Sequence, residues 1–163
     1  RLIFANIYEV CDNPDNIEAR RNMLHAAYLA GSAFTKSYVG YVHAVAHSLG
    51  GRYNVPHGLA NAVLLPHVLE AYGASAYKKL HELAMAIGIS NANEGHRAGA
   101  EKFINAVKEM KLRLDIPDRI REIRKKDISR LARYADKEAN PLYPVPKLMN
   151  AKELERFYYD VME

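Results

Sequence analysis

The sequence has very little of what secreted, membrane-spanning or disulfide-linked proteins contain. Its 163 residues include a single cysteine, Cys11, which excludes an internal disulfide and is typical of the reducing cytoplasm. No uninterrupted apolar run approaches the roughly 20 residues needed to span a bilayer. Nor does a basic segment followed by an apolar one open the chain. We therefore expect a cytoplasmic protein that does not enter a membrane.

A strong surplus of one charge is also missing. The formal net charge is only +4, and most basic residues alternate with acids, as in residues 119–127. Such alternation is typical of a solvated helix face, so we expect no nucleic-acid partner. The hydrophobic fraction of 49% and the charged fraction of 26% are those of an ordinary globular protein. The length suits one well-packed domain.

Several familiar catalytic signatures are absent. The chain has no serine in a glycine elbow, no glycine-rich loop for phosphates and no dinucleotide fingerprint after a strand. Cys11 has no neighbouring base that would activate its thiol. The sequence therefore contains no self-sufficient cofactor site, and its residues that would contact a coenzyme are unknown.

The alternation of apolar and polar residues that marks a half-buried strand is lacking throughout, so we predict an all-α fold. We expect one bundle-like helical domain over residues 1–163. Three prolines keep residues 140–146 out of any helix and favour an extended surface segment. Capping residues place helix starts at Asp15-Asn16, Ser75, Asn93-Glu94 and Asn150. The expected helices cover 2–11, 15–34, 43–50, 57–72, 75–88, 93–110, one or two segments of 120–134, and the residues after 150.

What the sequence does contain is a concentration of histidine. Residues 40–72 hold four of the seven histidines. His43 and His47 are four residues apart, so they share one face of a helix. That helix is expected to end at Gly50-Gly51, and Pro56-His57-Gly58 to open the next. Three imidazoles would then converge on one pocket, where they could ligate a metal ion.

Metal binding competes here with a structural role, in which buried imidazoles bond to the backbone. Residues 40–72 contain only one carboxylate, Glu70, and it lies far from His57 along the helix. Either the site is open, or its remaining ligands lie outside this chain. His67 is expected to make a structural hydrogen bond. The other histidines are expected on the surface or in packing roles: His25, His81 and His96.

The order of residues in the histidine segment resembles a known signature. The run GYVHAVAHSLGGRYNVPHGLANA, residues 40–62, is similar to the motif of the iron-containing (group III) alcohol dehydrogenases. The similarity continues through LLPHV at 64–68. It returns more weakly at Ile116-Pro117 and at EANPLYPVP, residues 138–146. It thus covers nearly the whole chain.

The resemblance implies that this chain is the C-terminal helical half of such an enzyme. Family members have an N-terminal α/β domain that binds NAD or NADP, with a divalent iron or zinc ion in the cleft between the domains. One aspartate and three histidines hold the ion, and two of these ligands are expected upstream of Arg1. The implied activity is metal-assisted hydride transfer between a small alcohol or aldehyde and NAD(P). The full-length enzyme is expected to be a homo-oligomer.

The resemblance also assigns roles to individual residues. His43 and His57 match the two remaining metal ligands. His47, a ligand on helical geometry alone, instead matches a catalytic residue near the nicotinamide and the substrate, where it is suited to move the alcohol proton. Phe34 matches a position that shapes the substrate pocket. Family members often carry a cysteine a few residues before the Asn-Pro of the late segment. Asp136 stands near that place, and this departure would alter the polarity of the pocket.

Two other interpretations stay open at this point. A glycerol dehydrogenase or a dehydroquinate synthase would share a helical metal-binding half. A non-catalytic helical interaction module would use its histidines only structurally. On the alcohol dehydrogenase interpretation, this chain alone is expected to be inactive and to bind metal poorly. Because half of the ligands are absent, the bonds to the ion offset little of the free-energy cost of removing its water.

Overall fold

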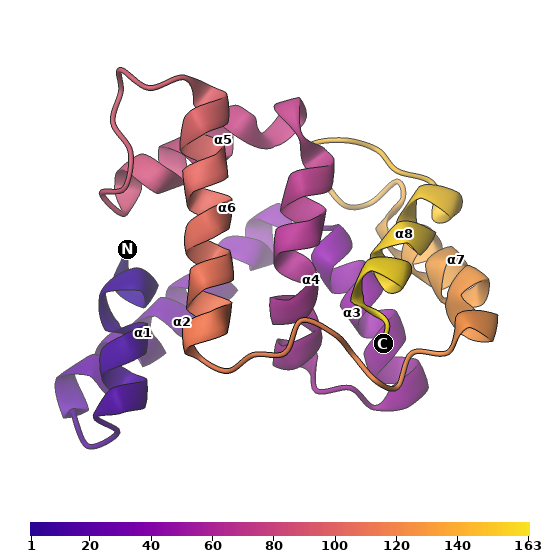
Figure 1. Ribbon diagram of the computed structural model, residues 1–163, viewed down its shortest axis with the longest axis horizontal. Helices are drawn as coiled ribbons and strands as arrows, with labels where there is room; N and C mark the ends of the chain where they lie inside the picture. Colours follow the sequence, from indigo (N-terminus) through magenta and orange to yellow (C-terminus); the bar gives the residue numbers. More distant parts are fainter.

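Eight α-helices and one short 3₁₀ helix make up the computed structural model, which describes all of residues 1–163 (Figure 1). No strand forms, and the only β-type pairing is an isolated bridge between Ile120 and Met162. The predicted all-α class is confirmed. The helices are α1 (Leu2–Asp12), α2 (Ile17–Ser37), α3 (Tyr41–Tyr53), α4 (His57–Tyr72), α5 (Ala74–Ala86), α6 (His96–Arg113), η1 (Lys125–Asp127), α7 (Ile128–Ala139) and α8 (Ala151–Val161).

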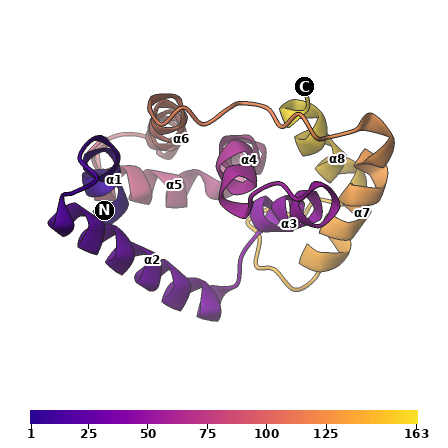
Figure 2. The ribbon, with the colours of Figure 1, turned by 90° about the horizontal axis from the view of Figure 1, so that it is seen from below.

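The hydrophobic core is centred on α4, which packs against α3, α6 and α8 (Figure 2). Apolar residues occur on several sides of this helix, and Val63, Leu64 and Val68 are completely buried. On the far side of α3, helices α7 and α8 complete the bundle. They contribute large buried side chains such as Phe157 and Tyr158. This packing holds α3 and the start of α4 in fixed positions.

Helices α1 and α2 form a hairpin at the other end of the molecule. They pack mainly on each other, and Figure 2 shows α2 extending away from α5 and α6. Helix α2 buries only Ala19 and Ala26, while Leu24 and Tyr28 are more than two-thirds exposed. Residues 38–40 connect α2 to α3. The chain has no helix that is both long and apolar enough to cross a membrane.

Several predicted helix ends are confirmed by their capping bonds. The Asn16 side chain accepts a hydrogen bond from the Ala19 N–H at 3.0 Å, and α4 has the predicted bounds. At α8 the Asn150 side chain accepts from the backbone of Glu153, while the Glu153 carboxylate accepts from the Asn150 N–H. This reciprocal pair is a capping box. Residues 140–150 are non-helical, as the prolines predict.

The predicted end of α3 at Gly50-Gly51 is wrong, because the helix continues to Tyr53. It ends at Asn54, which adopts the left-handed conformation with φ 57° and ψ 31° and donates its N–H to the Gly50 carbonyl at 2.9 Å. Asparagine tolerates this conformation better than most residues. The two glycines therefore lie within the last turns of the helix, and Asn54 starts the reversal toward α4.

Three other predicted starts need correction. Helix α5 begins at Ala74 after Gly73, with Ser75 inside it. Helix α6 begins only at His96, because Asn91 and Glu94 form a hydrogen-bonded turn instead. Residues 120–123 are not helical: the N–H of Ile120 donates to the Val161 carbonyl at 2.7 Å. Buried Ile120 and Ile123 thus fix a loop across the end of α8.

Candidate metal centre and active site

The turn between α3 and α4 brings three histidines together. His43 and His47 lie one turn apart on α3, and the Asn54–Pro56 turn returns the chain so that His57 opens α4. The ring centroids are 5.8 Å apart for His43 and His47, 5.4 Å for His43 and His57, and 5.2 Å for His47 and His57. The predicted convergence of the three imidazoles is therefore present.

His43 is the most enclosed of the three rings. Burial lowers the pKa of its imidazole below the ordinary value of 6.5, and the neighbouring His57 and His47 lower it further. A proton on His43 would be poorly solvated and would face two other basic rings. The neutral imidazole that results is the form that binds divalent metals.

His57 is held by a residue one turn further along α4. The Asn61 amide nitrogen lies 2.9 Å from His57 Nε2 and donates to the His57 carbonyl at 3.0 Å. The Asn61 carbonyl oxygen is buried and has no hydrogen-bond partner in the chain. Asn61 thus restrains the orientation of the ring, and its unpaired acceptor lies at the same site.

His47 is oriented by a carboxylate from the far end of the chain. Its Nδ1 lies 2.7 Å from Glu138 Oε1 on α7, and the Tyr143 hydroxyl donates to the same oxygen at 2.9 Å. Because a carboxylate only accepts, His47 Nδ1 carries the proton in this pair. The opposite nitrogen, Nε2, is then the atom that can accept one. Burial and the bond to Glu138 raise the pKa of Tyr143 to about 12, so its hydroxyl stays protonated as a donor.

Phe34 and His43 lie on one apolar hollow of about 440 Å³. Its wall comes from the end of α2, residues 38–40, the start of α3 and one side of α4, and Phe34 is half exposed at its rim. The residues that line it include Phe34, Val42, His43, Asn61, Leu65 and Tyr72. The predicted pocket residue and a predicted metal ligand therefore border the same space.

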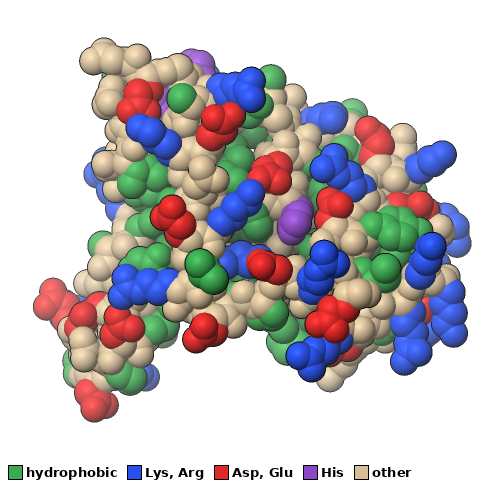
Figure 3. Space-filling view, in the orientation of Figure 1, with side chains coloured by type: hydrophobic (Ala, Val, Ile, Leu, Met, Phe, Trp, Pro, Cys, Tyr) green, Lys and Arg blue, Asp and Glu red, His purple; other side chains and the backbone are tan.

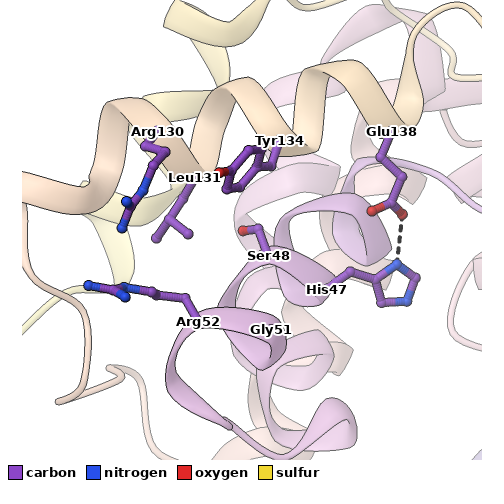
Figure 4. A pocket seen from close by; sticks show the side chains of 8 residues that line it. All are labelled: His47, Ser48, Gly51, Arg52, Arg130, Leu131, Tyr134 and Glu138. Carbon is purple, nitrogen blue, oxygen red and sulfur yellow. Dashed lines mark hydrogen bonds and ion pairs between the residues drawn. The ribbon is translucent and has the colours of Figure 1, made fainter.

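A second hollow, also of about 440 Å³, lies between α3 and α7 (Figure 4). We call it the α3–α7 groove. Its lining residues are His47, Ser48, Gly51, Arg52, Arg130, Leu131, Tyr134 and Glu138. His47 thus belongs to both the histidine cluster and the groove.

Asp136, expected near the place of a family cysteine, does not lie free in a pocket. Its carboxylate accepts a hydrogen bond from the Asn140 side chain at 2.7 Å. The Asn140 amide also donates to the Met149 carbonyl at 3.0 Å. Asp136 therefore helps to anchor residues 140–150 at the end of α7.

The donor atoms fit a divalent metal, but they are incomplete. Neutral imidazoles suit both iron and zinc. However, no three His, Cys, Asp or Glu side chains of this chain are placed to hold a metal ion together. The ring centroids are close, but two of the ring nitrogens are already in contact with other side chains. Glu138 binds His47 Nδ1, and Asn61 contacts His57 Nε2. Three free nitrogen donors therefore do not meet at one point. Further ligands would have to come from other residues.

Comparison with known proteins tests the resemblance drawn from the histidine motif. The model for the C-terminal region of the Fe-containing alcohol dehydrogenase family matches residues 1–162. The chain belongs to the iron-containing alcohol dehydrogenase family. Its membership confirms the resemblance drawn from the histidine motif.

Individual members of the iron-containing alcohol dehydrogenase family agree. The chain is 36% identical over 160 residues to 1,3-propanediol dehydrogenase of Klebsiella pneumoniae, which covers 97% of this chain and 41% of that protein. It is 41% identical over 126 residues to alcohol dehydrogenase 4 of Saccharomyces cerevisiae, covering 75% of this chain and 31% of that protein. The chain thus spans less than half the length of these relatives.

Solved structures of the family show the same fold. A crystal structure of 1,3-propanediol oxidoreductase superposes with a TM-score of 0.91 at 34% identity, covering 98% of this chain and 42% of that one. Alcohol dehydrogenase from Oenococcus oeni gives a TM-score of 0.89 at 32% identity, covering 98% of this chain and 42% of that one. The helical arrangement around the histidine cluster is therefore a shared feature of the family.

Sequence reasoning missed two contacts of the site, and one of its predictions outside the site is wrong. It gave no role to Glu138, whose contact with His47 joins residues 91 positions apart. It also gave no role to the Asn61 side chain, although its spacing of four from His57 on a helix signals this contact. The structural hydrogen bond predicted for His67 is absent. His81, by contrast, is a buried packing residue, one of the two roles expected for it.

Proposed function

We propose that this chain is the C-terminal metal-binding domain of an NAD(P)-dependent alcohol dehydrogenase. The observation that carries the proposal is the meeting of His43 and His57 beside the apolar hollow, with His47 held next to them by Glu138. The overall reaction is the oxidation of an alcohol to an aldehyde, with hydride passing to NAD(P)⁺ and a proton to solvent. An N-terminal domain would bind the coenzyme, which supplies the hydride chemistry.

In this proposal His43 and His57 are two of the ligands of an Fe²⁺ or Zn²⁺ ion. The bound ion would act as a Lewis acid toward the alcohol or aldehyde oxygen. The remaining ligands, an aspartate and a histidine, would lie upstream of Arg1. Asn61 would limit the rotation of the His57 ring, and its contact with Nε2 would have to give way if that nitrogen binds the ion.

His47 would be the group that moves the alcohol proton. Its Nδ1 is occupied by Glu138, so Nε2 is left to accept a proton and return it to solvent. The apolar hollow beside His43 would surround the reacting end of the substrate and exclude water, with Phe34 at its rim. The chain's own residues thus account for positioning, metal ligation and proton transfer.

The test separates metal ligation from catalysis in the full-length protein. We expect His57→Ala to lose the stoichiometric metal measured by emission spectroscopy. His47→Ala should keep the metal and lose about 100-fold or more in kcat, the usual contribution of general acid–base catalysis. If both variants lost the metal equally, His47 would be a metal ligand and not the group that moves the proton. Alcohol-dependent reduction of NAD(P) separates this enzyme from a dehydroquinate synthase, and strong turnover by residues 1–163 alone would contradict the proposal.

A further inference from the structure

The α3–α7 groove has two ends of different chemical character. The His47–Glu138 pair lies at one end, and Figure 4 shows the head groups of Arg52 and Arg130 on opposite walls at the other. Between them the wall is formed in part by Leu131. A ligand that lies along the groove would therefore have one end beside the proposed catalytic histidine and the other beside two guanidinium groups.

A buried carboxylate holds the two arginines in place. Asp127 is 5% exposed, and its Oδ2 accepts from Arg52 Nε and Nη2, both at 3.2 Å, while its Oδ1 accepts from Arg130 Nη2 at 2.9 Å. The Tyr53 hydroxyl donates to Oδ2 at 2.9 Å. Burial works against ionisation of Asp127, but the bonds from Tyr53 and Arg52 outweigh it, so its pKa lies below the ordinary value. The carboxylate is thus charged and fixes both guanidinium groups.

Most of the donors on these arginines remain free. Each guanidinium has five N–H groups. Arg52 gives two nitrogens to Asp127 and Arg130 gives one, and no other acceptor in the chain bonds to either side chain. Their side chains are 45% and 44% exposed where they line the groove. Two positive charges against one carboxylate leave a net positive charge at this end.

The surroundings strengthen the attraction for an anion. Residues 119–133 contain seven basic and two acidic residues. Lys and Arg side chains gather along the edge of the molecule formed by α7 (Figure 3). The carboxylate of the opposite end, Glu138, is already engaged by His47 and Tyr143. Clefts lined by one sign of charge concentrate oppositely charged ligands.

We propose that Arg52 and Arg130 bind a carboxylate or phosphate group at the end of the substrate that is remote from the reacting carbon. The substrate would then be an alcohol or aldehyde that carries an anionic tail. Arginine forks bind such planar or tetrahedral oxyanions through paired hydrogen bonds. This inference rests on the proposed alcohol dehydrogenase function, because His47 defines which end of the groove is reactive.

The first arm of the test is a calorimetric titration of the full-length protein with inorganic phosphate. Arg130→Gln should weaken phosphate binding about tenfold, since it removes a charge-assisted hydrogen-bond donor. Arg130→Lys keeps the charge but not the forked guanidinium group. Its affinity for phosphate should lie between those of the wild type and Arg130→Gln. The matched control is Arg133→Gln, which removes the same charge from an exposed position of α7 outside the groove. Thermal melts check that each variant is folded.

The second arm compares two aldehydes with the same number of carbons, butanal and 4-oxobutanoate. The ratio of kcat/KM for 4-oxobutanoate to that for butanal should favour the anion, and Arg130→Gln should lower this ratio about tenfold. Arg133→Gln should leave it within about twofold, as expected for an exposed charge. Phosphate should compete with 4-oxobutanoate and not with NAD(P), which excludes the coenzyme phosphate as the source of the anion.

Each contrary result has a distinct meaning. Absence of phosphate binding, or equal losses in Arg130→Gln and Arg133→Gln, would overturn the anion site. Competition of phosphate with NAD(P) would assign the site to the coenzyme and overturn the substrate assignment. Lack of turnover of either aldehyde by the metal-loaded protein would overturn the proposed function, while the phosphate titration would still decide whether the groove binds an oxyanion.

Discussion

At the scale of single residues, the site depends on contacts that fix the tautomer of one histidine. Glu138 accepts from His47 and from Tyr143, so its carboxylate is held from two directions. A fixed Nδ1–H leaves Nε2 of His47 as the proton acceptor, which a freely rotating imidazole would present only part of the time. Glu138 is therefore a positioning residue in the proposed enzyme, and it acts through His47.

The first prediction concerns Glu138→Gln in the full-length enzyme. The variant should retain its metal but lose about 10- to 100-fold in kcat, the usual cost of removing a carboxylate that orients a functional histidine. Tyr143→Phe is the control: it removes one bond to Glu138, and its kcat should stay within about threefold. Loss of metal in Glu138→Gln would instead mark Glu138 as part of the metal centre.

The second prediction concerns His67, whose surroundings disfavour a proton. Burial lowers the pKa of its imidazole below 6.5, with Asp160 opposing and Lys111 adding to this effect. The unfolded chain therefore binds the proton more readily, and stability should fall as the pH drops below about 6.5. In metal-free protein, His67→Gln should flatten the dependence of Tm on pH between about 7 and 5. His25→Gln, at an exposed position, should leave the slope unchanged, and equal slopes for wild type and His67→Gln would refute the assignment.

The residues of the site were predictable only where the signal is local. His43, His47 and His57 lie within one short segment, and the helical repeat together with the turn after Gly51 predicts their meeting. Their division into ligands and catalyst came from the family resemblance, since all three rings are nearly equidistant. Glu138 could not be found in this way. Its contact with His47 depends on how α7 docks on α3, which no short-range pattern encodes.

At the scale of elements, one glycine controls the contact between α5 and α6. A Cβ on Gly99 would overlap the His81 ring, which is 2% exposed. That ring cannot easily move, because its Nε2 lies 3.0 Å from the Asn91 carbonyl and its Nδ1 lies 3.1 Å from His96 Nδ1. Gly99 is therefore required by close approach of the two helices.

The third prediction follows from that approach. Gly99→Ala should destabilise the protein by about 1–3 kcal/mol, the usual cost of overpacking a core. The matched control is Gly31→Ala in the middle of α2, where a new Cβ meets nothing within 4 Å. There the higher helix propensity of alanine should stabilise by up to about 1 kcal/mol. Urea unfolding measures both free energies. An unchanged free energy of unfolding in Gly99→Ala would mean that α5 and α6 can move apart without loss of stability.

The boundaries of the elements show where local rules are outweighed. Asn16 and Asn150 start their helices as predicted, since a capping bond involves only the first turn. Gly50-Gly51 does not end α3, because burial of Leu49 and the tertiary contacts of the helix outweigh the low helix propensity of glycine. The spacing of Ile120 and Ile123 resembles a helical repeat. However, both residues belong to an irregular loop, and each side chain is buried without a helix. Periodicity alone does not distinguish these cases.

At the scale of the whole molecule, a long non-helical segment connects the ends of the bundle. Residues 140–150 run from the end of α7 to the start of α8 and lie across the start of α3. The buried Tyr41 hydroxyl is the point of attachment. Its oxygen lies 2.8 Å from Asn140 Oδ1 and 3.0 Å from the Met149 carbonyl oxygen, the two acceptors within reach of its single O–H, and it accepts from the Met149 N–H at 2.9 Å.

The fourth prediction tests whether this attachment supports the site. Tyr41→Phe should destabilise the protein by about 1–3 kcal/mol, because the buried Met149 N–H loses its acceptor and stays desolvated. Tyr77→Phe removes the hydroxyl of a partly buried tyrosine without any bonding partner and should cost less than about 0.5 kcal/mol. Urea unfolding measures the difference. Hydrogen exchange should also accelerate at residues 140–150 and at the end of α7, where Glu138 sits, because the segment loses its anchor. Exchange that changed equally in α5 and α6 would show instead that Tyr41 stabilises the bundle as a whole, and that the position of Glu138 does not depend on this anchor.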